Sequence, residues 1–309
     1  MSKIAFVFPG QGAQAVGMGK DAYDSVESAR SVYDRADEVL GFPLTELIFE
    51  GPDTELKKTV NTQPALLTTS VAYYEALKSK GITPDFVAGH SLGEYSALVV
   101  AGVLSFDDAV AIVRARGQYM EEAVPNGQGA MAAVLGLERD ALAALCVSVS
   151  ADTGVVELAN VNCPGQIVVS GSKEGVDGIV ARGKEAGAKR VLPLEVSGPF
   201  HSSLMKPAAA KLGDTLASVA MKDAAVPVIA NVTAQSVTQA EEIRKLLVEQ
   251  VYSPVLWEDS VRYLIDQGVD TFIEIGSGSV LAGLIKKIDK GVRIVSVNSL
   301  EALEGELLA

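Results

Sequence analysis

A serine between two glycines is the part of this sequence best suited to covalent chemistry: residues 89–93 are Gly-His-Ser-Leu-Gly. The apolar run 86–88 before it predicts a strand, and residues 94–101 after it predict a helix. A sharp strand-to-helix turn lifts a serine hydroxyl out of the sheet, to the positive end of the helix, where developing negative charge is favoured. The pentapeptide alone is a weak signal, but its position predicts Ser91 as a nucleophile.

A serine nucleophile needs a base, and the sequence holds only two histidines, His90 and His201. His90 is the chain neighbour of Ser91, and adjacent side chains diverge on a tight turn, so it is poorly placed to take the hydroxyl proton. His201 follows a Ser-Gly-Pro-Phe loop after a predicted strand, and loops beyond strand ends present catalytic groups in α/β folds. The alternative for His201 is a structural histidine that caps a helix. The presence of a candidate serine nucleophile and the absence of a third histidine favour the interpretation as a base.

Arg116 is unusual because helical periodicity places it inside an apolar face. The predicted helix 106–123 has a stripe formed by Ala109, Ile112, Val113, Tyr119, Met120 and Ala123. At 3.6 residues per turn Arg116 lies in the middle of this stripe, whereas Arg114 points elsewhere. An unpaired buried guanidinium is very unfavourable, so Arg116 must meet an anion. That anion is either an internal Asp or Glu or a substrate carboxylate, which the planar guanidinium binds through two hydrogen bonds; position alone leaves both open.

Two glycine-rich turns differ in their predicted roles. The loop 9–12 (Pro-Gly-Gln-Gly) follows a predicted first strand, 4–8, and can direct a backbone N–H at a carbonyl oxygen under attack, alongside the N–H of Leu92. Its alternative is an ordinary turn. The turn 276–278 (Gly-Ser-Gly) lacks the full fingerprint of a dinucleotide or phosphate loop and is interpreted as structural. No Cys/His set has metal-ligand spacing, so no zinc site is expected.

Composition restricts the class of protein and its partners. The 309 residues are 48% hydrophobic and 21% charged, which is typical of a globular protein, and the longest apolar stretch, 95–106, is too short to cross a bilayer. A net charge of −13 argues against nucleic acid or an anionic membrane as partner. An acidic partner would need a local basic patch, for which Lys189-Arg190 and Lys286-Lys287 are candidates; the alternative is solvated surface. Two cysteines and no signal-peptide pattern indicate the cytoplasm.

The order of predicted elements indicates an α/β fold with an insertion. A strand at 4–8, helices at 23–40 and 63–80, the turn around Ser91 and a helix at 106–123 imply a largely parallel sheet covered by helices. Residues 128–196 then follow a β-α-β-β-α-β order, which is the ferredoxin-like unit. The α/β rhythm resumes with predicted helices at 202–220, 240–251, 255–267 and 279–288 and strands at 226–230, 271–275 and 292–297. We therefore expect a catalytic domain of residues 1–127 and 197–309, interrupted by a subdomain at 128–196.

Taken together, these residues resemble one family over essentially the whole chain, the malonyl-CoA:acyl-carrier-protein transacylases of fatty acid synthesis. The matching segments are Phe-Pro-Gly-Gln-Gly at 8–12, Asn-Thr-Gln-Pro-Ala at 61–65, Gly-His-Ser-Leu-Gly-Glu-Tyr at 89–95, Arg-Gly at 116–117, Asn-Cys-Pro-Gly-Gln at 162–166, Phe-His-Ser at 200–202 and Tyr-Ser-Pro-Val at 252–255. The resemblance implies a hydrolase-like α/β domain interrupted by a ferredoxin-like subdomain. Ala13, where serine is frequent, and the turn 276–278, where Gly-Pro-Gly is usual, depart from the family pattern without touching the proposed chemistry.

The resemblance also implies roles for individual residues. Ser91 would take the malonyl group as an ester, and His201 would be the base that activates it and the acid that protonates the departing thiol. The main-chain carbonyl of Gln250 would orient His201, in place of a carboxylate. The N–H groups of Gln11 and Leu92 would form the oxyanion hole.

The same resemblance assigns Arg116 to the malonyl carboxylate. Phe200, just before the base, is similar to its counterpart in malonyl-selective domains, where it would crowd an α-methyl group. The implied reaction transfers malonyl from malonyl-CoA to the pantetheine thiol of acyl carrier protein, with no cofactor and no metal. We expect a cytoplasmic monomer.

Two other functions share some of these features. A serine esterase or thioesterase would use the same nucleophile and base but would give the acyl group to water. Arg116 and the lack of an obvious acidic partner for His201 argue against it, although Glu195 is a candidate for that partner. A catalytically silent carrier-binding subunit is the second alternative, and the presence of both Ser91 and His201 argues against it.

Overall fold

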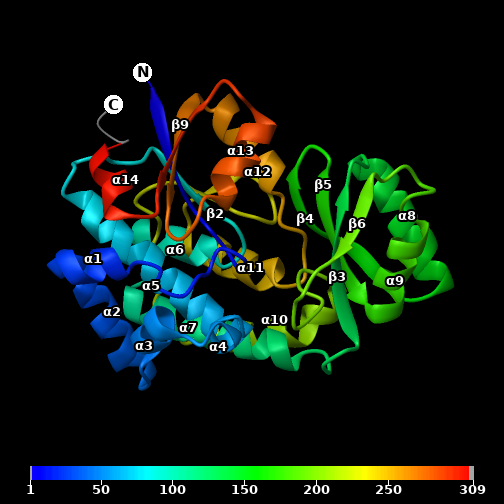
Figure 1. Cartoon of the computed structure of the whole chain (residues 1–309), viewed down its shortest axis with the longest axis horizontal. Coiled ribbons are helices and arrows are strands. Elements are labelled where there is room, and N and C mark those ends of the chain that lie inside the picture. Colours follow the sequence, from blue (N-terminus) through cyan, green and yellow to red (C-terminus); the bar gives the residue numbers. More distant parts are fainter. Residues whose placement is uncertain (1, 306–309) are drawn as a thin grey trace.

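The larger of two sheets forms the centre of the molecule (Figure 1). The computed structural model describes residues 2–305. Six strands pair in the order β10-β9-β1-β2-β7-β8, and all neighbours are parallel except β7 and β8. Their bounds are β1 Lys3–Phe8, β2 Phe86–Gly89, β7 Val228–Ile229, β8 Ser236–Val237, β9 Val269–Ile275 and β10 Arg293–Val297. This arrangement confirms the predicted parallel α/β sheet.

Alternation along β1 shows how the sheet is covered on both faces. Phe6 and Phe8 pack into the core formed with most of the helices, whereas Ala5 and Val7 face a second core that includes Trp257. The helices that contribute to the first core include α2 Glu27–Leu40, α5 Thr59–Lys78, α6 Gly93–Val100, α7 Phe106–Glu122, α10 Lys206–Ala217 and α11 Ala240–Gln250. Those of the second are α12 Trp257–Asp266 and α13 Val280–Ile288. Both faces of the sheet are therefore covered by apolar side chains and shielded from water, as is usual for a parallel sheet.

The smaller sheet is antiparallel and lies to one side of the larger body (Figure 1). Its strands pair in the order β4-β5-β3-β6, with bounds β3 Gly129–Leu135, β4 Val156–Cys163, β5 Gln166–Ser172 and β6 Arg190–Pro193. The helices α8 Arg139–Asp152 and α9 Lys173–Arg182 pack on it around a separate apolar core. This is the predicted ferredoxin-like unit, and the domain boundaries near 128 and 196 stay a prediction.

Several predicted helices have different bounds in the structure. The helix predicted at 23–40 is two helices, α1 Lys20–Ser25 and α2, because Val26 is extended (φ −120°, ψ 114°). The one predicted at 202–220 starts with a 3₁₀ turn, η1 Ser203–Met205, before α10. The one predicted from 255 starts at Trp257, since Val255 forms a β-bridge with Asn160.

Short elements escaped the sequence prediction. They are α3 Leu44–Glu50, α4 Asp53–Leu56, β8 and α14 Leu300–Gly305. The helix α5 begins at Thr59 rather than at 63 and contains Pro64, which has no N–H for the carbonyl of Val60. Arg114 donates to that carbonyl instead, at 2.9 Å. A side chain from another helix thus replaces the missing backbone bond, and this cannot be inferred from local propensity.

The turn between β2 and α6 depends on close contacts that only glycine allows. A Cβ on Gly89 would lie 1.9 Å from the carbonyl carbon and oxygen of Gly93, and a Cβ on Gly93 would lie 2.1 Å from the carbonyl oxygen of Phe8. The helix therefore starts directly against the strand. This packing fixes the residue between the two glycines at the carboxyl end of the sheet.

Replacing Gly89 with alanine should destabilise the protein by about 1–3 kcal/mol, because backbone must move to admit the methyl group. Gly283→Ala is the matched control: it lies exposed in α13 with no atom within 4 Å of the new Cβ, and alanine there should stabilise by about 0.5–1 kcal/mol. Urea unfolding of both variants measures the difference. Equal stabilities would contradict the role given to close packing at the turn.

Candidate active site

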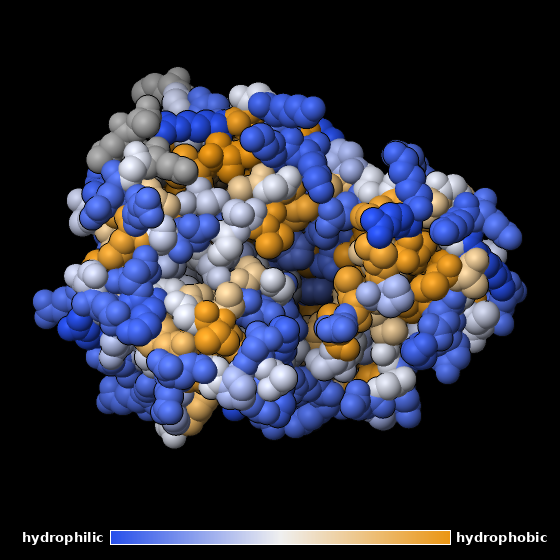
Figure 2. Space-filling model, viewed as in Figure 1, coloured by the Kyte–Doolittle hydropathy of each residue, from blue (hydrophilic) through white to orange (hydrophobic). Residues whose placement is uncertain are grey.

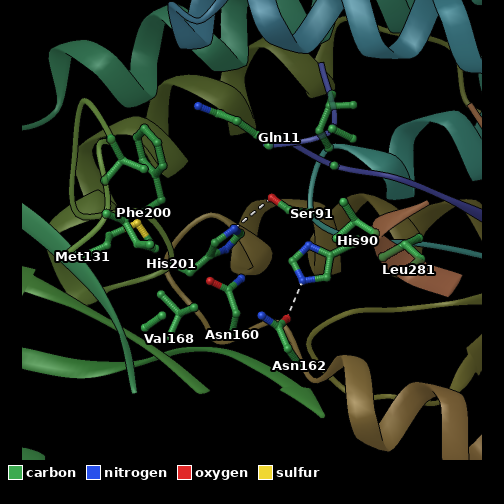
Figure 3. Close-up of a pocket in the computed structure, with 18 of the residues that line it drawn as sticks. Gln11, His90, Ser91, Met131, Asn160, Asn162, Val168, Phe200, His201 and Leu281 are labelled. Atoms are coloured by element: carbon green, nitrogen blue, oxygen red, sulfur yellow. Dashed lines mark hydrogen bonds between the residues drawn. The ribbon is translucent and has the colours of Figure 1, made fainter. Parts of the chain in front are cut away.

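Ser91 and His201, which are 110 residues apart, meet at the carboxyl edge of the large sheet. Ser91 follows β2 with φ 50°, and its Oγ lies 2.8 Å from Nε2 of His201 (Figure 3). His201 precedes η1 and also has a positive φ, 59°. A positive φ is unfavourable for residues other than glycine, so the surrounding structure holds both side chains in place. The two groups have the geometry of a nucleophile and its base.

The other ring nitrogen of His201 determines which tautomer is present. Nδ1 lies 2.8 Å from the main-chain carbonyl oxygen of Gln250, at the end of α11. A carbonyl only accepts hydrogen bonds, so Nδ1 carries the proton and Nε2 presents its lone pair to the hydroxyl of Ser91. The carbonyl thus performs the orienting function that a carboxylate performs in other serine enzymes.

Arg116 lies fully inside the protein, beside the nucleophile. Its side chain is 1% exposed, and its Nη2 donates to Oγ of Ser91 at 3.1 Å and to Oε1 of Gln250 at 2.9 Å. Its Nη1 donates to Oε1 of Gln63 at 2.8 Å, and its Nε has no protein partner. Within residues 2–305 no carboxylate forms an ion pair with it. Of the two anions that the sequence left open, the internal salt bridge is therefore absent here.

Arg116 reaches this position because of the helix phase predicted from the sequence. The buried residues of α7 include Ala109, Ile112, Val113, Arg116 and Met120, which is most of the predicted apolar stripe. Arg114 points away: its guanidinium lies over the ring of Phe42 at 4.5 Å and donates to backbone and side-chain oxygens of α5. The two arginines are two positions apart on one helix and only one faces the nucleophile.

A network of amides and one carboxyl group surrounds the turn. Nε2 of Gln250 donates to Oε2 of Glu94 at 2.8 Å and to the carbonyl of Ser91 at 3.1 Å. Oδ1 of Asn231 accepts from the N–H of Ser91 at 2.7 Å, and Nδ2 of Asn231 donates to the carbonyl of Gly89 at 2.7 Å. The backbone groups of the strained turn are therefore satisfied by side chains from the loop after β7 and from the last residue of α11.

Two backbone N–H groups remain beside the nucleophile. One belongs to Leu92, the residue directly before α6, and the other to Gln11, in the loop after β1. Within residues 2–305 neither N–H donates a hydrogen bond to another protein group. The side chain of Gln11 donates to Oγ1 of Thr59 at 3.1 Å, and that oxygen lies 3.0 Å from Oγ of Ser197. This chain of contacts links the loop of Gln11 to the loop that carries His201.

His90 has a structural environment. Its Nε2 lies 2.8 Å from Oδ1 of Asn162, and its ring packs against Trp257 with centroids 5.7 Å apart. Figure 3 shows it pointing away from the bond between Ser91 and His201. Burial lowers the pKa of His90. It is thus not placed to take the proton of Ser91.

A cavity of about 300 Å³ opens over the nucleophile between the two sheets. Polar groups line its floor, and Met131, Val168, Phe200, Leu194 and Leu281 make part of its wall apolar (Figure 3). Figure 2 shows a hollow between the larger body and the small subdomain, with hydrophilic residues inside it and hydrophobic residues along its rim. A cavity of this size and lining can enclose a small polar group away from bulk water.

The electrostatics of the site keep His201 neutral. Burial, and then the charge of Arg116, lower the pKa of His201 to about 3. Burial raises the pKa of Glu94 to about 7, against the opposing effects of its hydrogen bonds and of Arg116. Across residues 2–305, no three His, Cys, Asp or Glu side chains gather as the ligands of a metal ion would. The groups present suit acid–base and nucleophilic chemistry.

Sequence reasoning missed several residues of this site. The side chains of Gln63, Asn231, Glu94 and Gln250 were given no role, although the motifs at 61–65 and 89–95 contain Gln63 and Glu94. The available signal for Gln63 was its place in the motif at 61–65, because α5 buries several polar residues and their pattern does not set Gln63 apart. Nothing in the local sequence signalled Asn231.

Comparison with known proteins agrees with this architecture. Residues 5–302 match the family model described as an acyl transferase domain. The chain is 57% identical over 304 residues to the malonyl CoA-acyl carrier protein transacylase of Bacillus subtilis, covering 98% of this chain and 96% of that protein. A crystal structure of an acyl carrier protein S-malonyltransferase from Vibrio cholerae superposes with a TM-score of 0.96 at 46% identity, covering 99% and 100% of the two chains.

A further solved structure holds a partner. It is a malonyl-transacylase in complex with a type II PKS acyl-carrier protein, and it is 44% identical with a TM-score of 0.95, covering 98% of each chain. The fold, the serine–histidine pair and the matching family model define an acyltransferase. The chain belongs to the malonyl-CoA:acyl-carrier-protein transacylase family.

None of the helices within residues 2–305 has the length and apolar composition that a membrane span requires.

The low pKa of His201, about 3, makes stability depend on pH. An unfolded histidine titrates near 6.5, so between pH 6 and 4 the unfolded chain binds a proton that the folded chain does not, and acid favours unfolding. The His201→Gln variant lacks this contribution. The slope of its free energy of unfolding against pH should therefore be smaller than that of the wild type, by about 1.4 kcal/mol per pH unit.

Urea unfolding of both proteins at pH 4 to 6 measures this difference. Glu94 and Glu274, whose pKa values burial raises to about 7, shift stability in the opposite direction, but they are present in both proteins and cancel in the comparison. Parallel pH profiles would mean that His201 is not buried in its neutral form.

Proposed function

We propose that Ser91, His201 and Arg116 carry out the transfer of a malonyl group from malonyl-CoA to acyl carrier protein. The observation that carries the assignment is the distance of 3.1 Å between Nη2 of Arg116 and Oγ of Ser91. A malonyl ester on Ser91 has its free carboxylate on the carbon next to the ester carbonyl. A guanidinium this close to the hydroxyl can therefore reach that carboxylate, whereas an acetyl group offers it nothing.

In the first half-reaction the enzyme is acylated. Nε2 of His201 takes the hydroxyl proton as Oγ of Ser91 attacks the thioester carbonyl of malonyl-CoA. The N–H groups of Gln11 and Leu92 receive the oxyanion of the tetrahedral intermediate. When the intermediate collapses, the C–S bond breaks and the proton on Nε2 passes to the departing thiolate of coenzyme A. The neutral tautomer supports this role, because its lone pair already faces the hydroxyl.

The second half-reaction reverses these steps with another thiol. The pantetheine thiol of acyl carrier protein gives its proton to His201 and attacks the malonyl ester, and Ser91 recovers its proton as the C–O bond breaks. Lys189 and Arg190, at the start of β6, and Lys286 and Lys287, on α13, are exposed. The loop after β6 and the first half of α13 contribute Leu194 and Leu281 to the cavity. The charge of the four basic residues would attract an acidic carrier protein to a chain that is itself acidic.

Hydrolysis is the main competing outcome, and the surroundings of His201 argue against a hydrolase. Glu195, which the sequence left as a candidate partner of His201, is exposed, and Nδ1 of His201 bonds to the carbonyl of Gln250 instead. The apolar wall that includes Phe200 and Met131 limits the space for water beside the ester. Phe200 also supports the exclusion of an α-methyl group, as in methylmalonyl.

The chain would act as a monomer in the cytoplasm. Every group assigned to the reaction comes from one copy of the chain, so no second copy is needed to complete the site. The two cysteines, Cys146 and Cys163, are buried and unpaired, which agrees with a reducing compartment. Sedimentation equilibrium at several concentrations tests the monomer directly.

Incubation with malonyl-CoA alone should leave one malonyl group on the peptide that contains Ser91, because transfer stops when no carrier is present. Mass spectrometry of the intact protein and of its peptides measures this, and Ser91→Ala should carry no label. Adding acyl carrier protein with its pantetheine arm should move the label to the carrier. Release of the label mainly as free malonate would instead identify a hydrolase.

Arg116→Ala should lower kcat/KM for malonyl-CoA relative to acetyl-CoA by roughly a hundredfold, since it removes a charge-assisted contact that only malonyl makes. Arg114→Ala is the matched control on the same helix, and it should leave the ratio unchanged because that side chain faces Phe42. Acylation rates with both substrates give the ratio. An Arg116→Ala enzyme with the wild-type preference would exclude Arg116 as the carboxylate-binding residue.

A further inference from the structure

Glu94 is a buried acidic residue that the reaction described above does not use. It lies in the first turn of α6, three residues after the nucleophile, and is 2% exposed. Its Oε2 accepts from Nε2 of Gln250 at 2.8 Å and from the backbone N–H of Asn231 at 3.1 Å. A carboxyl group is rarely buried in this way without a specific function in its network.

The contact with Gln250 determines which way the Gln250 amide faces. As it stands, Oε1 of Gln250 accepts from Arg116, while Nε2 donates to Glu94 and to the carbonyl of Ser91. Rotation of the amide by half a turn would bring its NH₂ group against the guanidinium, donor to donor, and its oxygen against the oxygens of Glu94 and Ser91. Glu94 and Arg116 therefore select the same orientation from opposite ends of one amide.

This amide is one of two amide side chains that hold the guanidinium by hydrogen bonds. The other is Oε1 of Gln63, which accepts from Nη1 of Arg116. Both supports are neutral oxygens, and the remaining Nη contact goes to Ser91, where the acyl group will be attached. The ring of Tyr95 also lies 5.4 Å from the guanidinium, but a ring face does not fix the direction of the N–H groups. A misplaced Gln250 amide would therefore leave the guanidinium with a single hydrogen-bonding support, and its Nη2 could turn away from the ester. Specific recognition requires such a side chain to be held within about half an ångström.

We propose that Glu94 is a positioning residue for substrate selection: by orienting the Gln250 amide, its carboxyl group holds the Arg116 guanidinium where the malonyl carboxylate binds. This inference depends on the proposed role of Arg116. It assigns selectivity for a carboxylated acyl group to a residue that touches neither the substrate nor the nucleophile's hydroxyl. The function of Glu94 is to supply an acceptor oxygen at this place, so glutamine can replace it and an apolar side chain cannot.

The test is the ratio of kcat/KM for malonyl-CoA to that for acetyl-CoA, measured as the acylation rate of Ser91. Glu94→Leu should lower this ratio about tenfold or more, whereas Glu94→Gln, which keeps an acceptor oxygen, should stay within about threefold of wild type. A purely structural defect would slow both substrates together and would leave the ratio intact. An unchanged ratio in Glu94→Leu would overturn the inference.

Two further measurements separate positioning from general damage. Glu274→Leu removes another buried carboxyl group, which caps the first turn of α13 by accepting from the N–H groups of Leu281 and Ala282. It should lower stability and leave the ratio unchanged. In an Arg116→Ala background, Glu94→Leu should change the ratio no further, because the residue through which it acts is gone. An additional loss of the ratio in that background would contradict the inference.

The outcomes distinguish this inference from the proposed function. If Arg116→Ala keeps the malonyl preference, the role of Arg116 fails, and the role of Glu94 fails with it. If Arg116→Ala loses the preference and Glu94→Leu keeps it, only the inference about Glu94 fails. Should Glu94→Leu not fold, Gln250→Leu takes its place, since it removes the amide but keeps the carbonyl that orients His201. The ratio in that variant should fall to the same extent, and an unchanged ratio would refute the proposal.

Discussion

The constraint on which this structure depends is a guanidinium buried beside a nucleophile with no carboxylate paired to it. Arg116 is 1% exposed, its hydrogen bonds go to two amide oxygens and to the hydroxyl of Ser91, and its guanidinium lies over the ring of Tyr95. A buried charge whose hydrogen-bond partners are all neutral is poorly compensated, and in the proposed reaction the malonyl carboxylate would supply the missing charge. In the proposed reaction, binding and specificity would therefore share one cause, because the negative charge that Arg116 lacks is the group that distinguishes malonyl from acetyl.

The choice of a carbonyl to orient the base follows from the same constraint. A carboxylate next to His201 would stand close to Arg116 and would compete with the substrate for it. The carbonyl of Gln250 holds Nδ1 without adding a full negative charge. The same residue uses its side chain to support Arg116, so α11 serves the base with its backbone and the specificity residue with an amide. Burial then keeps the imidazole neutral and ready to accept a proton.

The fold brings these groups together because parallel strands end at one edge. Ser91 follows β2, Gln11 follows β1 and Asn231 follows β7, and these three strands are neighbours in the sheet. The small subdomain contributes the opposite wall of the cavity through Met131 and Val168, which explains why an insertion with its own core belongs to the enzyme. The serine–histidine pair, the two free backbone N–H groups and the cavity are thereby built from segments that are far apart in the chain.

Local pattern in the sequence determined the strand-to-helix turn at Ser91, the burial of Arg116 and the β-α-β-β-α-β insertion, because periodicity of 2 or 3.6 residues and glycine placement are local properties. The choice between Arg114 and Arg116 also followed from helix phase alone. Tertiary structure decided the rest. In the folded chain Arg116 has two glutamines as hydrogen-bond partners and no internal salt bridge. Glu94 accepts a hydrogen bond from Gln250, and Asn231 accepts one from the backbone of the turn. These contacts join residues more than 50 positions apart, and no local periodicity encodes which buried polar groups will meet once the helices and strands have packed.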